Sequence, residues 1–424
     1  MRDALFARIE AKTAELVELT RDLIRIPTVN PPGDAYADCA QFIGERLRRR
    51  GFDVAYPRGE GTPGDSDRYP RTNVVARRAG GRPGPCVHFN GHIDVVEVGD
   101  GWTTPPFGGE VKDGKVFGRG ACDMKGGIAA SIIAVEAICE EFPEFAGVLE
   151  ISGTVDEESG GYGGVAHLAR QGFFTRPRVD HVIIPEPLNV DRVCLGHRGV
   201  WWAEIETYGR IAHGSMPFLG DSAIRHMAAV LEKFEREFYP YLATKRTTMP
   251  VAPDGARQST MNINSIHGGL AEGFEGWPSA VVADSCRMVI DRRYLIEESY
   301  EEVRGEIVNL LEALRRERPG FRYDLRELWT VPPTMTDRNA AVVRAVAAEI
   351  ERVLSRPAEF VISPGTYDQK HIVRIAGLKE CIAYGPGILD LAHQPDEYVA
   401  IEDLVASAKV MAASALALMG SGQA

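Results

Sequence analysis

The first half of the chain alternates short apolar runs with longer amphipathic stretches. Runs rich in valine and isoleucine, bounded by glycine and proline, predict buried strands. Stretches with an apolar residue at every third or fourth position predict helices between them. The predicted strands cover 72–80, 85–96, 147–158 and 180–187, and the predicted helices cover 38–51, 126–142 and 161–173. This alternation is typical of an α/β layered domain with a largely parallel central sheet.

The pattern changes near residue 198 and reverts near residue 319. Segment 199–211 alternates apolar and polar residues, which predicts a half-exposed antiparallel strand. The segments after it read as a helix over 221–239, strands over 260–269 and 280–295, and a charged helix over 297–317. Two helices beside an antiparallel sheet form an α+β arrangement. We therefore expect a first domain of residues 1–198 and 319–424, with a second domain of residues 199–318 inserted into it.

Composition narrows the class of protein. The 424 residues carry 48 Lys and Arg against 60 Asp and Glu, a net charge of −12, which disfavours nucleic acid as a partner. Seven cysteines occur singly, which favours a reducing, cytoplasmic compartment. The N-terminal segment 1–27 is charged throughout, which predicts an amphipathic helix ending near Pro27 and not a signal peptide. The apolar C-terminal segment 404–420 is short for a membrane span, so we expect a packed helix and no membrane partner.

Histidines and carboxylates recur where predicted strands end or where loops are rich in glycine and proline. In parallel sheets, ligands bind beyond the carboxyl ends of the strands. A mixture of imidazole and carboxylate groups suits two divalent ions that share one carboxylate, with a further carboxylate free to act as a base. The residues concerned are His92 with Asp94, Asp123, Glu157 with Glu158, Glu186, and His393.

Each of these positions has another interpretation when it is taken alone. His92 and Asp94 share one face of a strand and would also suit part of a catalytic triad or a surface pair. Asp123 precedes two glycines and would suit a helix N-cap. Glu157 and Glu158 would suit a solvated turn, and the remaining two positions would suit loop residues. The combination, in this order and in these contexts, favours a metal centre.

The motifs together resemble those of the zinc-dependent aminoacylase and carboxypeptidase family, which includes acetylornithine deacetylase and succinyl-diaminopimelate desuccinylase. The resemblance extends over nearly the whole chain. It implies a zinc-binding α/β domain with an inserted α+β lid domain, through which the family usually forms homodimers. The motifs that carry it are GHIDVV, GRGACDMKGG, GTVDEESGG, IIPEP, GRIAHGSMP and AHQPDE.

The resemblance also implies a role for each residue of the expected centre. The ions would be two divalent cations, zinc first, with cobalt or manganese compatible. A glutamate at position 186 is typical of family members that act as deacylases or carboxypeptidases rather than aminopeptidases. The implied roles are metal ligands at His92, Asp123 (bridging), Glu158, Glu186 and His393, a general base at Glu157, and an orienting carboxylate at Asp94.

Residues of the inserted domain resemble those that contact substrate in the family. His213 matches a histidine that one subunit lends to its partner's site, although it would also suit a turn. Arg293 matches an arginine that grips a substrate carboxylate, although it would also suit the surface. Asn262 and the loop 363–371, with Asp368, are expected to line the pocket.

The expected function is a cytoplasmic di-zinc amidohydrolase that removes a small acetyl, formyl or succinyl group from an amino acid or related amine, most similar to acetylornithine deacetylase. One departure is Glu275, which occupies a position where desuccinylases carry an asparagine. It leaves room for a neutral or cationic substrate. The alternatives are an N-formyl aminopyrimidine deformylase, a dipeptidase or carboxypeptidase, and an inactive binding protein.

Overall fold

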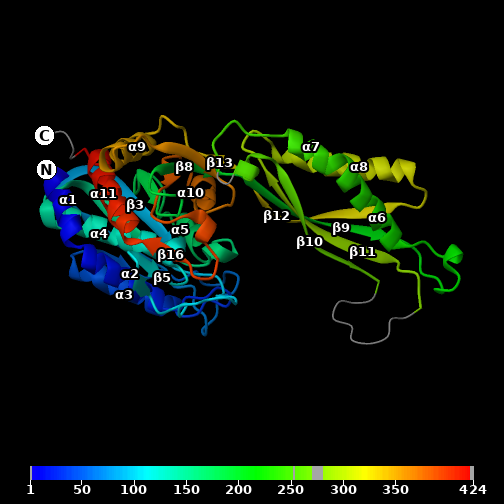
Figure 1. The fold of residues 1–424 in the computed structure, drawn as a ribbon, viewed down its shortest axis with the longest axis horizontal. Helices are drawn as coiled ribbons and strands as arrows, with labels where there is room; N and C mark the ends of the chain where they lie inside the picture. The colour runs from blue at the N-terminus through cyan, green and yellow to red at the C-terminus, as the bar shows by residue number, and fades with distance from the viewer. Residues whose placement is uncertain (1, 252–253, 270–279, 421–424) are drawn as a thin grey trace. The chain divides into compact units, whose positions relative to one another are not determined.

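The computed structural model describes residues 2–251, 254–269 and 280–420 (Figure 1). The chain folds into two compact units. The first comprises Met1–Gly196, Thr336–Val361 and Tyr367–Ala424, and the second comprises His197–Met335 and Ile362–Thr366. Glu275 lies outside the described residues.

The first unit is built on a nine-stranded sheet with four parallel strands at its centre. Strand β3 (Arg82–His92) pairs in parallel with β6 (Ala146–Thr154) and with β7 (His181–Ile184), and β7 pairs in parallel with β15 (Cys381–Ala383). The flanking pairs are antiparallel where β2 meets β6, β1 meets β2, and β8 meets β15. The remaining strands are β1 (Asp53–Ala55), β2 (Val74–Ala79), β8 (Arg192–His197), β13 (Thr334–Met335) and β14 (Glu359–Ser363).

Helices pack on both faces of this sheet. On one face Gly91 of β3 lies so close to Ile128 of α4 that an added Cβ would approach its side chain to 2.6 Å. On the other face His88 stacks on Phe174, with ring centroids 4.7 Å apart. The helices are α1 (Arg2–Ala11), α2 (Thr13–Arg25), α3 (Tyr36–Arg49), α4 (Gly126–Glu141), α5 (Val165–Arg170), α9 (Ala341–Leu354), α10 (Gln369–Ala376) and α11 (Ile401–Leu418). A small antiparallel sheet joins β4 (Glu110–Lys112), β5 (Lys115–Phe117) and β16 (Tyr398–Ala400).

The C-terminal apolar segment forms α11, which packs against α4 and α9, as expected for a helix buried in the domain. Within the described part of the chain, no helix combines the length and hydrophobicity that crossing a bilayer requires.

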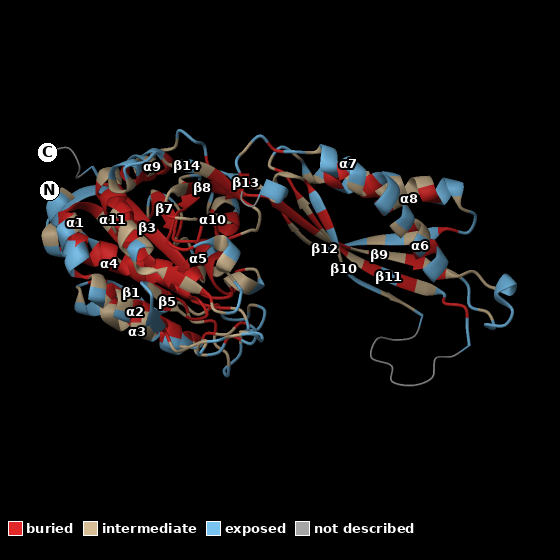
Figure 2. Cartoon of the chain, in the orientation of Figure 1, coloured by how far each residue is buried: buried red, intermediate tan, exposed pale blue. Residues whose placement is uncertain are grey.

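The second unit is a four-stranded antiparallel sheet covered by helices. The strand order is β10 (Thr260–Gly268), β11 (Ser285–Tyr294), β9 (Gly199–Tyr208), β12 (Arg322–Val331). Helices α6 (Ala223–Lys233) and α8 (Tyr300–Glu317) pack on its apolar face, and α7 (Tyr239–Thr244) follows the η4 segment (Phe234–Phe238). Figure 2 colours each strand of this sheet by burial, which alternates along β9. Trp201 belongs to the buried cluster under the helices, whereas Trp202, on the opposite face, is half-buried.

These architectures confirm the predicted α/β fold with an inserted α+β domain. The C-terminal boundary of the second unit differs from the predicted one, because β12 follows α8 and forms the edge of the second unit's sheet, which extends this unit to Met335 instead of residue 318. The N-terminal helical segment is divided at Lys12 into α1 and α2.

Candidate metal centre

Strands that are neighbours in the sheet of the first unit place the predicted residues at one edge of that sheet. His92 is the last residue of β3, and Glu186 follows β7, which lies beside β3. Glu157 and Glu158 lie in the short η2 helix (Glu157–Ser159) that follows β6. Since these three strands are parallel neighbours, their carboxyl ends meet, which is the geometry that parallel sheets use for ligand sites.

Asp123 reaches the same place from the start of a helix. It lies in η1 (Ala121–Lys125), which leads into α4. A Cβ added at Gly127 would lie 2.0 Å from the carbonyl oxygen of Pro185, so a glycine is needed for the first turn of α4 to approach the segment that carries Glu186.

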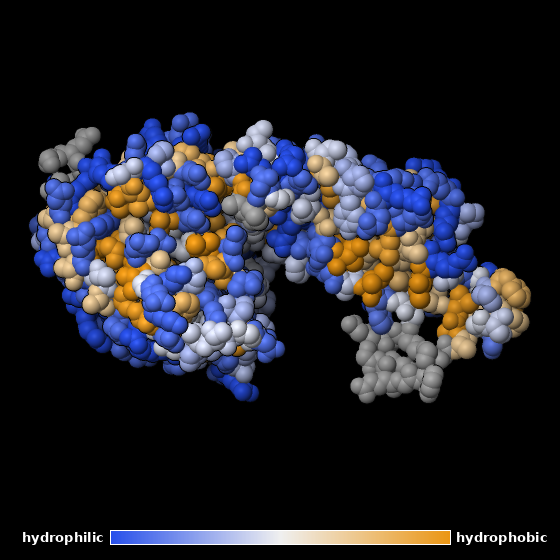
Figure 3. Space-filling view, in the orientation of Figure 1, coloured by the Kyte–Doolittle hydropathy of each residue, from blue (hydrophilic) through white to orange (hydrophobic). Residues whose placement is uncertain are grey.

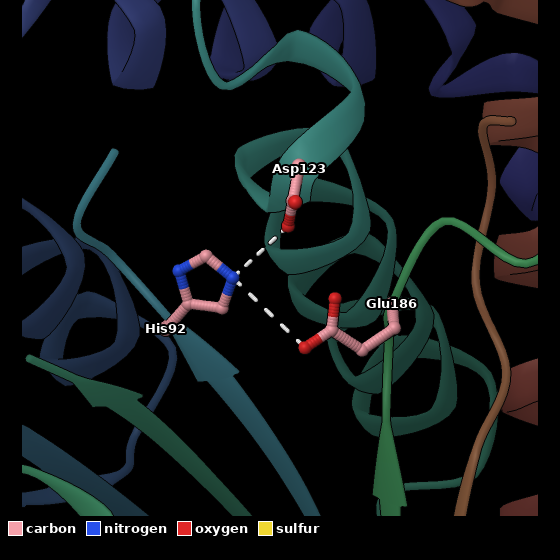
Figure 4. A group of neighbouring side chains, drawn as sticks. All are labelled: His92, Asp123 and Glu186. Atoms are coloured by element: carbon pink, nitrogen blue, oxygen red, sulfur yellow. Dashed lines mark hydrogen bonds and ion pairs between the residues drawn. The ribbon is translucent and has the colours of Figure 1, made fainter. Parts of the chain in front are cut away.

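The first cluster consists of His92, Asp123 and Glu186 (Figure 4). Nε2 of His92 lies 3.0 Å from Oδ1 of Asp123 and 3.9 Å from Oε1 of Glu186. Nδ1 of His92 donates to the carbonyl oxygen of Asp94 at 3.0 Å. Because a carbonyl oxygen only accepts, Nδ1 carries a proton, and Nε2 is the nitrogen that faces the two carboxylates and would bind an ion.

The second cluster consists of Asp123, Glu158 and His393. Nε2 of His393 lies 3.1 Å from Oε1 of Glu158 and 3.5 Å from Oδ2 of Asp123. Asp123 therefore faces one cluster with Oδ1 and the other with Oδ2, which is the arrangement that a bridging carboxylate requires.

Asp94 ties the strand end of β3 to the turn that carries Glu157 and Glu158. Its carboxylate accepts from the backbone N–H groups of both glutamates at 3.2 and 3.1 Å and from Nδ2 of Asn30 at 2.8 Å. Its Oδ1 lies 3.6 Å from Nδ1 of His92, farther than its own carbonyl oxygen. Asp94 thus orients His92 through its main chain, while its side chain organises the neighbouring turn.

Glu397 holds the segment that contains Asp123. Its Oε1 accepts from the backbone N–H groups of Cys122 and Asp123 at 2.8 and 3.0 Å. Its Oε2 accepts from Arg119 at 2.6 Å, and both side chains are almost wholly buried. The position of Asp123 is therefore fixed from the loop that also carries His393.

Glu157 is separate from both clusters. Its Oε1 accepts from Nζ of Lys370 at 2.8 Å. Asp368, which the sequence places in the same loop region, is buried and accepts from Asn90 at 2.8 Å.

The electrostatics of this region fit bound cations. Burial and the carboxylates of Asp123, Glu157 and Asp368 raise the pKa of Glu186 well above its usual value. Burial, opposed by a hydrogen bond from His393, raises the pKa of Glu158 to about 7. Hydrogen bonds to Asp123 and Glu158 raise the pKa of His393 to about 10. Carboxylates crowded into a buried region favour a cation among them, and the imidazole and carboxylate donors suit zinc and related divalent metals.

The structure places three further predicted residues in the second unit. His213 is in the exposed loop after β9, where Nδ1 accepts from the backbone N–H of Ser215 at 3.2 Å. Arg293 forms a bidentate ion pair with Asp291 through Nε at 2.7 Å and Nη2 at 2.9 Å. Asn262 lies on β10 and donates to Asn264 at 2.8 Å.

Sequence reasoning missed the supporting residues Asn30, Arg119 and Glu397, and it placed Lys370 only within the expected pocket loop 363–371, without its contact to Glu157. Glu397 follows His393 closely and stands in the motif AHQPDE, so its position was a usable signal. Neither Asn30 nor the contact of Lys370 with Glu157 gives such a signal, because each contact forms only when a distant segment folds against it.

Two clusters that share a carboxylate define the class of a metal-dependent hydrolase. Residues 88–417 match the model of peptidase family M20/M25/M40, and the chain belongs to this family. A succinyl-diaminopimelate desuccinylase of Marinobacter nauticus is 30% identical over 395 residues, which cover 92% of this chain and 94% of that relative. The protein is a hydrolase that acts on amide bonds.

Solved structures share the fold. The dipeptidase Dug1p of Saccharomyces cerevisiae has a TM-score of 0.75 at 18% identity, with 100% of this chain and 99% of that chain covered. The Bacillus subtilis YXEP protein, described as a dinuclear metal binding peptidase from the M20 family, has a TM-score of 0.67 at 16% identity, with 97% and 99% covered.

Proposed function

We propose that this protein is a di-zinc amidohydrolase that removes a small N-acyl group, with succinyl as the first candidate, from an amino acid or related amine. The observation that carries the proposal is the placement of Asp123 between two clusters that each contain a histidine and a glutamate. The succinyl group is supported by the name of the Marinobacter relative. Zinc is supported by the nitrogen and oxygen donors, and a pair of ions by the description of the Bacillus protein.

In this proposal His92, Asp123 and Glu186 hold one ion, and Asp123, Glu158 and His393 hold the other. When bound, the ions supply the Lewis acidity that activates water and polarises the amide carbonyl. Glu157 accepts a proton from the attacking water, whose oxygen forms a bond to the carbonyl carbon. The C–N bond then breaks as Glu157 returns that proton to the leaving nitrogen.

We also assign substrate contacts to residues of the second unit, on the strength of the resemblance described above. His213 of one subunit would donate a hydrogen bond, in the partner subunit's site, to the carbonyl oxygen that becomes negative when water attacks. Arg293 would pair with a substrate carboxylate, with its guanidinium plane held by Asp291 and with Asn262 nearby on the adjacent strand.

The second unit also carries the surface that we assign to a homodimer. Exposed apolar side chains gather on the loop 211–219, at the start of α6, on β10 and at Val281, and Figure 3 shows hydrophobic surface on this unit. Phe218 is 78% exposed. Exposed apolar side chains that gather in one region often mark interaction sites in soluble proteins. The residues are Ile211, Met216, Phe218, Leu219, Ile224, Ile266 and Val281.

A substrate panel tests the proposal. Metal-depleted protein is reconstituted with zinc, cobalt or manganese and offered N-succinyl, N-acetyl and N-formyl amino acids and unmodified dipeptides, with release of free amine as the readout. We expect turnover of N-acyl substrates, fastest with succinyl. Turnover of dipeptides alone would contradict the deacylase proposal, and tight substrate binding without any turnover would favour an inactive binding protein.

A further inference from the structure

The first turn of α10 sends three buried polar side chains toward the site from one short segment. Asp368, Lys370 and His371 are all buried. Each contacts a different part of the strand ends or the turn that carries Glu157. With Gln369, which contacts other segments, the helix start has four buried polar groups; this is unusual, because each group loses its hydration and needs a partner.

Two of these side chains anchor the helix. Oδ2 of Asp368 accepts from Asn90 on β3 at 2.8 Å and from Thr154 on β6 at 3.2 Å. Nε2 of His371 donates to the carbonyl oxygen of Gly160 at 2.7 Å. The start of α10 is therefore attached both to the strands that end at the metal centre and to the turn after Glu157.

Lys370 lies between these anchors and contacts Glu157. Its side chain is 1% exposed, and Nζ donates to Oε1 of Glu157, whose side chain is 11% exposed. A buried ammonium has few orientations that avoid a large desolvation cost, so this contact restricts both side chains. It engages one oxygen of the carboxylate and leaves Oε2 for another partner.

We propose that Lys370 is a positioning residue for Glu157, holding Oε1 so that Oε2 is presented to the water that is deprotonated. The inference rests on the proposed function, in which Glu157 is the general base. The alternative is that the ion pair compensates two buried charges and has no influence on turnover.

Kinetics of two substitutions separate these roles. Lys370→Met keeps the length of the side chain and removes the ammonium, whereas Lys370→Arg keeps a cationic donor. We expect Lys370→Met to lower kcat at least tenfold, with KM changed less than about twofold and metal content close to that of the parent. Its Tm should fall, because Glu157 loses a buried counter-charge, so the kinetics are measured well below that Tm. We expect Lys370→Arg to recover most of the loss in kcat. Lys409→Met, the same exchange at a surface pair with Glu10 in this unit, is the matched control. An unchanged kcat in Lys370→Met would overturn the proposal.

Combination with Glu157→Gln shows whether Lys370 acts through Glu157. If it does, adding Lys370→Met to Glu157→Gln causes no further loss of the residual turnover. A further loss as large as in the parent would mean that Lys370 acts independently, and would overturn the proposal.

Crystal structures of the parent and of Lys370→Met supply a readout that does not depend on activity. We expect one rotamer of Glu157 in the parent and a different or divided rotamer in Lys370→Met. A single unchanged rotamer would overturn the positioning role. Failure of the parent to hydrolyse any amide in the panel would instead refute the proposed function, while the rotamer comparison would still decide the role of Lys370.

Discussion

Two groups of charged side chains around a buried centre, one in each unit, differ in their charge balance. In the second unit, Arg292 donates to Glu298 at 3.1 Å and to Glu306 at 3.2 Å, and Lys245 donates to the same two carboxylates. Two cations face two carboxylates. Although burial alone would raise it, the pKa of Glu298 is held below its usual value, chiefly by Arg292.

The group in the first unit lacks this balance. Carboxylates at Asp123, Glu158 and Glu186 face two imidazoles, and the pKa values of both glutamates are raised, first by burial. The difference shows that burial of charge has two outcomes. Where arginine and lysine side chains compensate the carboxylates, the ion pairs stabilise the fold. Where carboxylates outnumber the cationic side chains, a bound cation would compensate the remaining negative charge.

The largest expected effect is on turnover, and it concerns Glu157 in the first unit. Glu157→Ala should lower turnover by about 10³-fold or more, because it removes the proposed proton acceptor. Metal content should stay at about two ions per chain, since Glu157 lies in neither cluster. Steady-state kinetics and elemental analysis measure the two quantities, and unchanged turnover would remove Glu157 from the mechanism.

Removing a cation from the second-unit group, in which Arg292 and Lys245 face Glu298 and Glu306, should instead destabilise the protein. Arg292→Met leaves Glu298 and Glu306 buried with less compensation, so we expect a loss of about 3–5 kcal/mol in the free energy of unfolding of the second unit. Arg326→Met, which removes an exposed partner of Glu204, is the control and should cost less than about 1 kcal/mol. Urea unfolding gives both values. Equal effects would mean that burial does not distinguish the two pairs.

A pH series tests the contact by which His371 attaches the start of α10 to the turn after Glu157. Burial, helped by Lys370, lowers the pKa of His371 to about 3. Because the unfolded chain binds a proton near pH 6.5 that the folded chain does not, the stabilisation is full above that pH and is lost as the pH falls. Between pH 7 and pH 5 the parent should lose about 2 kcal/mol relative to His371→Gln, which keeps a donor for Gly160. Parallel pH dependence of the two proteins would contradict this assignment.

The smallest expected effect concerns the cluster carboxylates Asp123, Glu158 and Glu186 in protein from which metal has been removed. In chelated protein, Glu186→Gln removes a carboxylate whose pKa is raised, so the variant should be more stable than the parent by about 1 kcal/mol. The ionised form of Glu186 is the unfavourable one, so the difference should grow as the pH rises. With metal restored the order should reverse, because the variant has lost a proposed ligand. Thermal unfolding with and without chelator measures both, and a less stable chelated variant would contradict the prediction.

The order of helices and strands was predictable from the sequence, because hydrophobic periodicity is a local property of each segment. It misplaces the end of the second unit, although residues 322–331 alternate in the way expected of β12. Strand alternation after a long helix does not tell which of two sheets the strand joins. The break at Lys12 was also missed, since apolar positions continue through it.

The candidate site was predictable as far as its residues stand in local motifs at strand ends. His92 and Glu186 meet because the parallel strands β3 and β7 end together, and Asp123 joins them from the segment that leads into α4. Lys370 and Asn30 depend on where α10 and the segment before α3 settle against the sheet, and nothing local in the chain encodes that.

Asp123 contributes to both clusters and is held by Glu397, and the second cluster includes His393. His393 and Glu397 follow the second unit in the sequence, whereas the other residues of both clusters precede it. A proteolytic cut within the second unit would therefore divide these residues between two fragments, and neither fragment alone would hold the complete second cluster.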